Sequence, residues 1–232
     1  MKPLERLLVV LVLTLLIGGG VYFNYSQKLQ VDSVKLPSYV EQHKNFQKWI
    51  TNHKNKDINL EADDFRLLEE SEVYNTQRLK LYPLTDLIML ERYNMLVKDQ
   101  ADVVDKRTSP DGKQFVNYVY DYRIGLSNTT YLPSDVWYLG IRGDRIIENK
   151  LVSCNVKANC IVDRAFFISD DVIVVSEVMR DIDTDLSYPP CSVTEVCTYK
   201  IRLNVMDIAQ NSNLIYESPS FELVLADKIE GF

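Results

Sequence analysis

Alternation of apolar and polar residues constrains the fold of this chain more than any other feature of its sequence. It is clearest in residues 114–122 and 135–139, and similar segments follow at 145–152, 161–168, 171–179, 198–207 and 213–225. Period-two alternation is typical of a strand with one buried face. Turn residues separate the segments at short intervals, which predicts antiparallel hairpins from about residue 79 onward.

The residues before the strands favour helices. In residues 38–54 apolar side chains recur every three or four positions, and Ser38 with Glu41 forms a predicted capping box. A second, acidic helix is predicted over 61–72, whereas residues 84–105 suit either a helix or a strand pair. No fixed-period repeat is visible, and the strand pattern is too short for a closed propeller at four strands per blade.

An uncharged apolar run occupies residues 7–23, preceded by Lys2 and Arg6. Its length and the charges before it predict a transmembrane signal-anchor with a cytoplasmic N-terminus and an extracytoplasmic, periplasmic or extracellular, main domain. A cleaved signal peptide is the alternative. The predicted fold class is therefore α+β: a transmembrane helix, one or two amphipathic helices, and a mainly antiparallel β-sheet or sandwich. The corresponding segments are an anchor at 1–25, a stalk at 26–37, a helical segment at 38–78 and a β-rich domain at 79–232.

The four cysteines form two pairs with the same spacing, five residues between the members of each pair. Local pairing predicts two disulfides, Cys154–Cys160 and Cys191–Cys197, which fits an exported protein. A four-cysteine metal site fits poorly, because zinc knuckles place their thiolates closer together in the sequence.

Several classes of function are disfavoured by what the sequence lacks. The net charge of −7 argues against a nucleic-acid partner. Only two histidines occur, His43 and His53, both within residues 38–54. No glycine-rich loop follows the apolar run, so a nucleotide cofactor is not expected, and no other cofactor is indicated. No catalytic residue is assigned.

Three groups of side chains are candidate sites. A ligand or a partner protein would use an aromatic strand face or a basic helix face; the residues are Tyr118, Tyr120, Tyr122, Lys44, Lys48 and Lys54. Asp181, Asp183 and Asp185 alternate as calcium ligands do, but the glycine and the glutamate of an EF-hand loop are missing, so an acidic connection is favoured over a metal site. Arg142-Gly143-Asp144 is interpreted as a hairpin turn.

The expected function is a binding or structural component of the cell envelope whose partner is another envelope protein. Two alternatives stay open. One is a sugar or small-ligand sensor that uses the tyrosine face. The other is a hydrolase that works through carboxylates; the candidates are Asp170, Asp171, Glu177, Asp181, Asp183 and Asp185. The sequence does not determine the oligomeric state.

Overall fold

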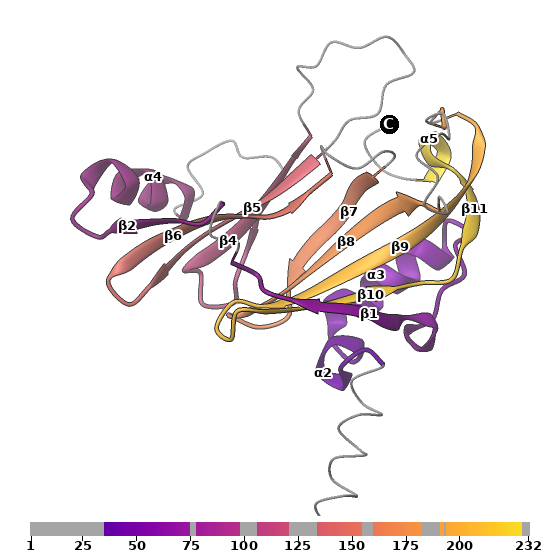
Figure 1. Ribbon diagram of the computed structural model, residues 1–232, viewed down its shortest axis with the longest axis horizontal. Coiled ribbons are helices and arrows are strands. Elements are labelled where there is room, and N and C mark those ends of the chain that lie inside the picture. The colour runs from indigo at the N-terminus through magenta and orange to yellow at the C-terminus, as the bar shows by residue number, and fades with distance from the viewer. Residues whose placement is uncertain are drawn as a thin grey trace, which may run out of the picture.

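The computed structural model of the chain describes residues 35–74, 78–97, 106–120, 134–154, 160–181, 191–192 and 194–228. They form two antiparallel β-sheets that pack against each other, with short helices on the outer faces (Figure 1). Sheet A has the order β1-β10-β9-β8-β7, and β11 also pairs with β9. Sheet B has the order β2-β6-β5-β4-β3.

The strands of sheet A are β1 (Arg66–Ser71), β7 (Cys160–Phe167), β8 (Val172–Arg180), β9 (Val196–Asp207), β10 (Ser212–Glu217) and β11 (Phe221–Val224). Those of sheet B are β2 (Lys80–Pro83), β3 (Lys106–Thr108), β4 (Gln114–Tyr120), β5 (Ser134–Arg142) and β6 (Arg145–Ser153). The prediction of β-sheet from the alternating segments is confirmed, and each of these segments contains a strand.

The two sheets share one topology that the sequence did not reveal. In each, four consecutive strands run as an antiparallel meander, β7 to β10 in sheet A and β3 to β6 in sheet B. A strand from earlier in the chain then pairs with the last strand of each meander, β1 with β10 and β2 with β6. Residues 66–83 therefore complete both sheets.

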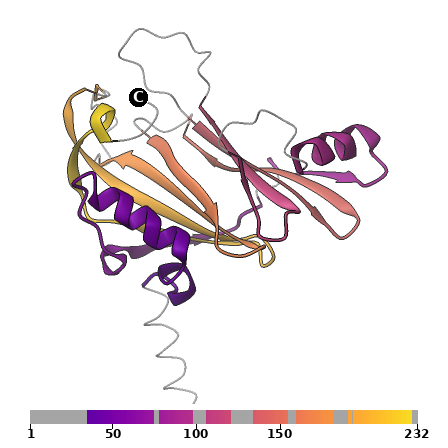
Figure 2. The same ribbon diagram turned by 180° about the vertical axis from the view of Figure 1, so that it is seen from behind.

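Three layers of buried side chains hold the fold together. Helix α3 (Lys44–Lys54) packs Phe46, Trp49 and Ile50 against the outer face of sheet A, and Figure 2 shows the helix in front of the strands. A second layer lies between the sheets and includes Val116 and Val175. The third lies between sheet B and helix α4 (Leu87–Val97). The order of layers is helix, sheet, sheet, helix.

The predicted fold class, α+β with an N-terminal transmembrane helix, was wrong. The described chain is mainly antiparallel β-sheet, and among the described residues no helix has the length and apolar character needed to cross a bilayer. The predicted transmembrane helix of residues 7–23 lies outside the described residues and receives no support. The predicted acidic helix over 61–72 is a short 3-10 helix (Ala62–Asp64) followed by β1, because the segment pairs with β10 along its backbone.

The predicted helix over 38–54 is divided. Helix α2 (Ser38–Glu41) ends at Gln42, and α3 begins after His43, whose Nδ1 accepts a hydrogen bond from the Asn45 backbone N–H at 3.2 Å. His43 is therefore a helix N-cap and Ser38 is not. The ambiguous segment 84–105 contains α4. A fourth short helix, α5 (Leu225–Lys228), follows β11.

Candidate functional site

Helix α4 covers part of the outer face of sheet B. Its first turn is held by the Asp86 carboxylate, which accepts the Met89 backbone N–H at 3.0 Å. Met89 and Tyr93 are buried against the sheet, and the Tyr93 hydroxyl donates to the Lys113 carbonyl at 2.7 Å. Burial raises the pKa of Tyr93, and the nearby Asp111 carboxylate raises it further. The helix is thus fixed by one cap, one hydroxyl and two buried side chains.

A groove of about 650 Å³ lies between α4 and the part of sheet B that the helix leaves uncovered. Its volume is within the range of small-ligand and side-chain pockets. Most of its lining is apolar; the residues are Ile88, Met95, Leu96, Phe115, Trp137, Tyr138 and Leu139, with Glu91, Arg92, Asn117 and Glu148 as the polar members.

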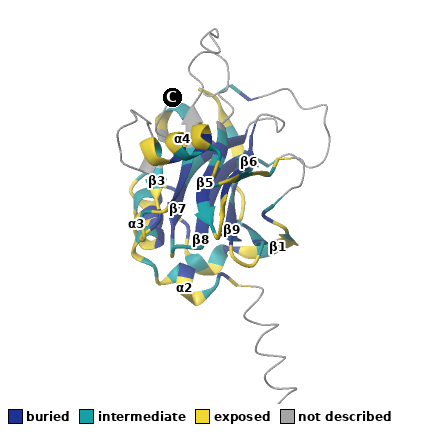
Figure 3. Cartoon of the chain, turned by 90° about the vertical axis from the view of Figure 1, so that its left-hand side faces the viewer, coloured by how far each residue is buried: buried dark blue, intermediate teal, exposed yellow. Residues whose placement is uncertain are grey.

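The helix surface beside the groove is also apolar. Leu87 and Ile88 are 76% and 80% exposed, and Met95 is half exposed. Figure 3 shows the corresponding exposed surface of α4 in front of the buried strands. A groove and an exposed apolar helix face at one place mark a surface for interaction, because large apolar side chains are seldom left exposed together without such a role.

Charged groups border the groove on one side. The buried carboxylate of Glu148 accepts from Arg92 at 2.9 Å and from the Tyr82 hydroxyl at 3.3 Å, and the Lys80 ammonium lies 3.8 Å away. Burial and the adjacent Glu148 charge raise the pKa of Tyr82. The Glu148 carboxylate is paired with Arg92 and Lys80, so it does not create a strongly negative site at the edge of the groove.

Asn117 gives the groove a directional polar contact. Its amide oxygen is buried and accepts no hydrogen bond in the described part of the protein. Such an atom stabilises any occupant that donates a hydrogen bond to it, since the acceptor otherwise remains desolvated. The same wall carries Trp137, whose ring has the Lys150 ammonium 4.9 Å from its centre.

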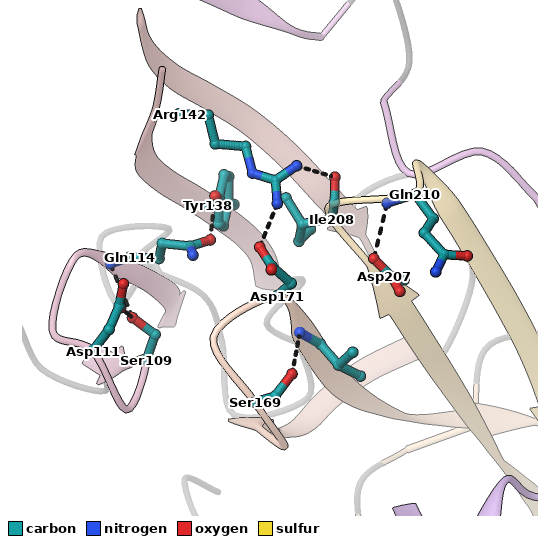
Figure 4. A network of polar contacts seen from close by, with 11 residues as sticks. Ser109, Asp111, Gln114, Tyr138, Arg142, Ser169, Asp171, Asp207, Ile208 and Gln210 are labelled. Carbon is teal, nitrogen blue, oxygen red and sulfur yellow. Dashed lines mark hydrogen bonds and ion pairs between the residues drawn. The ribbon is translucent and has the colours of Figure 1, made fainter. Parts of the chain in front are cut away.

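The two sheets are joined by contacts between their turns (Figure 4). Arg142, at the end of β5, donates to the Ile208 carbonyl at 3.0 Å and pairs with the Asp171 carboxylate, both on turns of sheet A. Nearby, the Tyr138 hydroxyl donates to Gln114, and burial raises the pKa of Tyr138. Arg142 of the Arg-Gly-Asp triplet is therefore engaged in the contact between the two sheets. Gly143 has a φ of +57°, as the hairpin turn requires.

The predicted basic surface is spread over the α3 region. Lys48 lines a second cavity of about 260 Å³ together with residues of β3 and β7, among them Arg107 and Arg164. Lys54 forms an ion pair with Glu61 at 2.5 Å, and Lys44 is exposed. The structure brings none of the three to the α4 groove.

The predicted aromatic and acidic groups are described only in part. Tyr118 and Tyr120 belong to strand β4, while their side chains and all of Tyr122 lie outside the described residues. Asp183 and Asp185 also lie outside them. Asp181 pairs with Lys200 at 2.9 Å and accepts from Ser220; the hydrogen bond from Lys200 is the main cause of its lowered pKa.

The other predicted carboxylates have separate partners. Asp170 accepts from the Asp111 backbone N–H at 2.7 Å, and Asp171 pairs with Arg142. Glu177 is buried and accepts from Asn204 at 3.0 Å. Of the described candidates, Asp170 and Asp171 lie in the turn before β8, Glu177 lies within β8 and Asp181 follows it, and each is held by a partner of its own.

The predicted disulfides are both present, Cys154–Cys160 and Cys191–Cys197. No described cysteine is free. Two disulfides in one chain indicate an oxidising, extracytoplasmic environment.

The groove itself was missed by sequence reasoning, although one indication was present. Along β4 and β5 both faces carry large apolar residues, Val116 and Val136 on one and Phe115 and Leu139 on the other. Strands that are apolar on both faces are covered on both faces. The pattern therefore predicts that another element covers the outer face of sheet B, and the ambiguous segment 84–105 is the candidate for it.

Comparison of the chain with family models, with curated proteins and with solved structures found no match.

Proposed function

We propose that this chain is an extracytoplasmic binding protein of the cell envelope, and that the groove beside α4 receives apolar side chains of a partner protein. The observation that carries the proposal is the combination of the apolar groove with the exposed side chains of Leu87, Ile88 and Met95. The disulfides support the compartment.

A protein partner is favoured over a small molecule by how the apolar surface is arranged. A small ligand would fill the groove and leave Leu87 exposed on the helix, whereas a protein surface would cover both at once. Protein interfaces are typically built around an apolar centre with charged groups at the rim. Here Glu91 and Arg92 supply such a rim on α4.

The proposal is tested by photo-crosslinking in cells that express the protein naturally. A photoreactive residue is placed at Ile88 or Met95 in the full-length chain, and at Leu68 as the control. Leu68 is also an exposed apolar residue, 53% accessible, but it lies on β1 in sheet A.

We expect the two α4 positions to crosslink to the same protein and Leu68 not to do so. A Met95→Asp substitution, combined with the probe at Ile88, should abolish that adduct, because a carboxylate would be buried in an apolar groove. Equal labelling from Leu68, or no protein adduct from either α4 position, would refute the proposed partner class. Purified protein that carries a small apolar molecule in the groove would instead favour a small-ligand site there, distinct from the tyrosine face of the sensor alternative.

A further inference from the structure

The Cys154–Cys160 disulfide lies directly against a buried carboxylate. Cys154, Cys160 and Glu177 are 1%, 0% and 1% exposed. The Glu177 Oε1 atom lies 3.8 Å from the Cys154 sulfur and 3.6 Å from the Cys160 sulfur. The sulfur atoms and a carboxylate oxygen therefore converge within 4.8 Å of one another.

In the closed disulfide the contact contains no hydrogen bond. A disulfide sulfur carries no proton, so neither sulfur donates a hydrogen bond to Oε1. Two thiols would donate such bonds, and a cation bound between two thiolates and the carboxylate would be attracted by all three groups. The carboxylate is therefore better placed for the reduced pair than for the oxidised one.

The distances match a particular cation. Tetrahedral zinc, with bonds of about 2.3 Å to sulfur and about 2.1 Å to oxygen, holds a sulfur ligand and an oxygen ligand about 3.6 Å apart. The two sulfur–oxygen distances in the structure, 3.6 and 3.8 Å, are close to this value. Only the two sulfurs must separate, to about 3.8 Å for the same ion, and this separation requires that their covalent bond be broken.

Neighbouring side chains orient the carboxylate as the surroundings of a metal ligand usually do. Asn204 donates to the other oxygen of Glu177 at 3.0 Å. The side-chain oxygen of Asn204 in turn accepts from the side-chain nitrogen of Asn213 at 3.4 Å. The same nitrogen lies 3.4 Å from the Ser71 hydroxyl. The chain of contacts crosses β8, β9, β10 and β1, so the position of Oε1 is set by sheet A.

We infer that Cys154, Cys160 and Glu177 form a redox-gated site for a thiophilic divalent cation such as zinc, independent of the α4 groove. A dithiol reductant supplies two electrons and two protons, becomes a disulfide itself, and converts the Cys154–Cys160 bond into two thiols. The metal ion then displaces both thiol protons into solvent and forms two metal–sulfur bonds and one metal–oxygen bond. Three protein ligands leave a fourth position for water.

The second disulfide provides an internal control. Cys191–Cys197 has the same sequence separation of six, but among the described residues no third ligand joins it. The full-length protein is reduced with a phosphine and titrated with Zn²⁺ by indicator competition. Parallel titrations with Cd²⁺ follow the ultraviolet charge-transfer absorbance of metal thiolates. The variants are Glu177→Gln, the double variant Cys154→Ser/Cys160→Ser, and the double variant Cys191→Ser/Cys197→Ser.

We expect one ion per reduced chain in the natural protein and in the Cys191→Ser/Cys197→Ser variant, and none in the oxidised protein. Binding should be lost in Cys154→Ser/Cys160→Ser and weakened at least tenfold in Glu177→Gln. The inference fails if the reduced natural protein binds no metal, or if removal of Cys191 and Cys197 abolishes binding. It also fails if Glu177→Gln binds as tightly as the natural protein. Should Glu177→Gln not fold in its oxidised form, Glu177→Asp and the two cysteine double variants decide the outcome.

Discussion

Replacement of Arg142 by methionine tests whether the turn contacts of Figure 4 hold the two sheets together. Methionine keeps an unbranched apolar stem but removes the guanidinium that reaches from sheet B to Ile208 and Asp171 on sheet A. The matched control is Arg145→Met at the other end of the same hairpin turn. Arg145 is exposed and lies 3.8 Å from the Asp144 carboxylate, which belongs to the same turn.

The expected loss of stability follows from the two contacts. A hydrogen bond to a carbonyl contributes about 1 kcal/mol, and one from a charged donor somewhat more. The ion pair with Asp171 is partly exposed, with 28% and 43% of the two side chains accessible, so it adds at most about 1 kcal/mol. We expect Arg142→Met to lower the free energy of unfolding by about 2 kcal/mol, whereas Arg145→Met should change it by less than about 0.5 kcal/mol.

Urea unfolding under non-reducing conditions measures both changes. For a chain of this size, 2 kcal/mol corresponds to a fall of about 4–8 °C in the melting temperature. An Asp171→Ala variant completes a double-mutant cycle and isolates the ion pair from the carbonyl contact. If Arg142→Met and Arg145→Met are equally stable, the turn contacts do not join the sheets, and the packed layer between the sheets accounts for their attachment alone.

Three further outcomes are expected. The chain has two tryptophans, Trp49 on the buried face of α3 and Trp137 in the groove, so Trp137→Phe should remove most of the acrylamide-quenchable fluorescence and Trp49→Phe should not; equal losses would mean that the groove is closed. Burial raises the pKa of Tyr216 to about 12, above its value in the unfolded chain, so its stabilisation is complete below about pH 10 and is lost as the pH rises through 12. Tyr216→Phe should therefore unfold less readily at alkaline pH and be unchanged at pH 7, as measured by denaturant titration; an unchanged alkaline limb would contradict this. Cys191→Ser/Cys197→Ser should lose about 2 kcal/mol, the chain-entropy value for a short loop, and a variant as stable as the natural protein in urea would show that the bond does not constrain the unfolded chain.

Strands with one face in a packed layer were predictable because this burial imposes alternation on the sequence. In Val196–Asp207, for example, the buried Tyr199, Ile201 and Leu203 alternate with the less buried Lys200 and Arg202. Val172–Arg180 is instead buried on both faces, and its neighbouring residues contribute to opposite layers. The cysteine pairs were predictable for a different reason, since short spacing leaves few geometries for pairing in an exported chain.

The elements that were missed depend on partners far away in the sequence. Strand β1 is charged and largely exposed, and its conformation comes from backbone pairing with β10. The acidic residues that suggested a helix around 61–72 instead meet lysines, as in the ion pairs Lys35–Asp63 and Lys54–Glu61. The sequence indicates that the outer face of sheet B is covered, but the groove itself combines α4 with three strands whose order in sheet B is a tertiary property.

The way residues 66–83 complete both sheets has a consequence for the order of folding. In the backbone pairing of β1 with β10, Arg66 lies opposite Glu217, roughly 150 positions later in the sequence. Forming this contact closes a long loop and therefore costs conformational entropy. During synthesis both meanders can form as local hairpins, but β1 must wait until β10 has emerged. Until then β1 is an unpaired strand to which other chains could bind. The charges of Arg66, Glu69 and Glu70 on the waiting strand discourage such association, so these residues act as protection against aggregation in the slowest step of assembly.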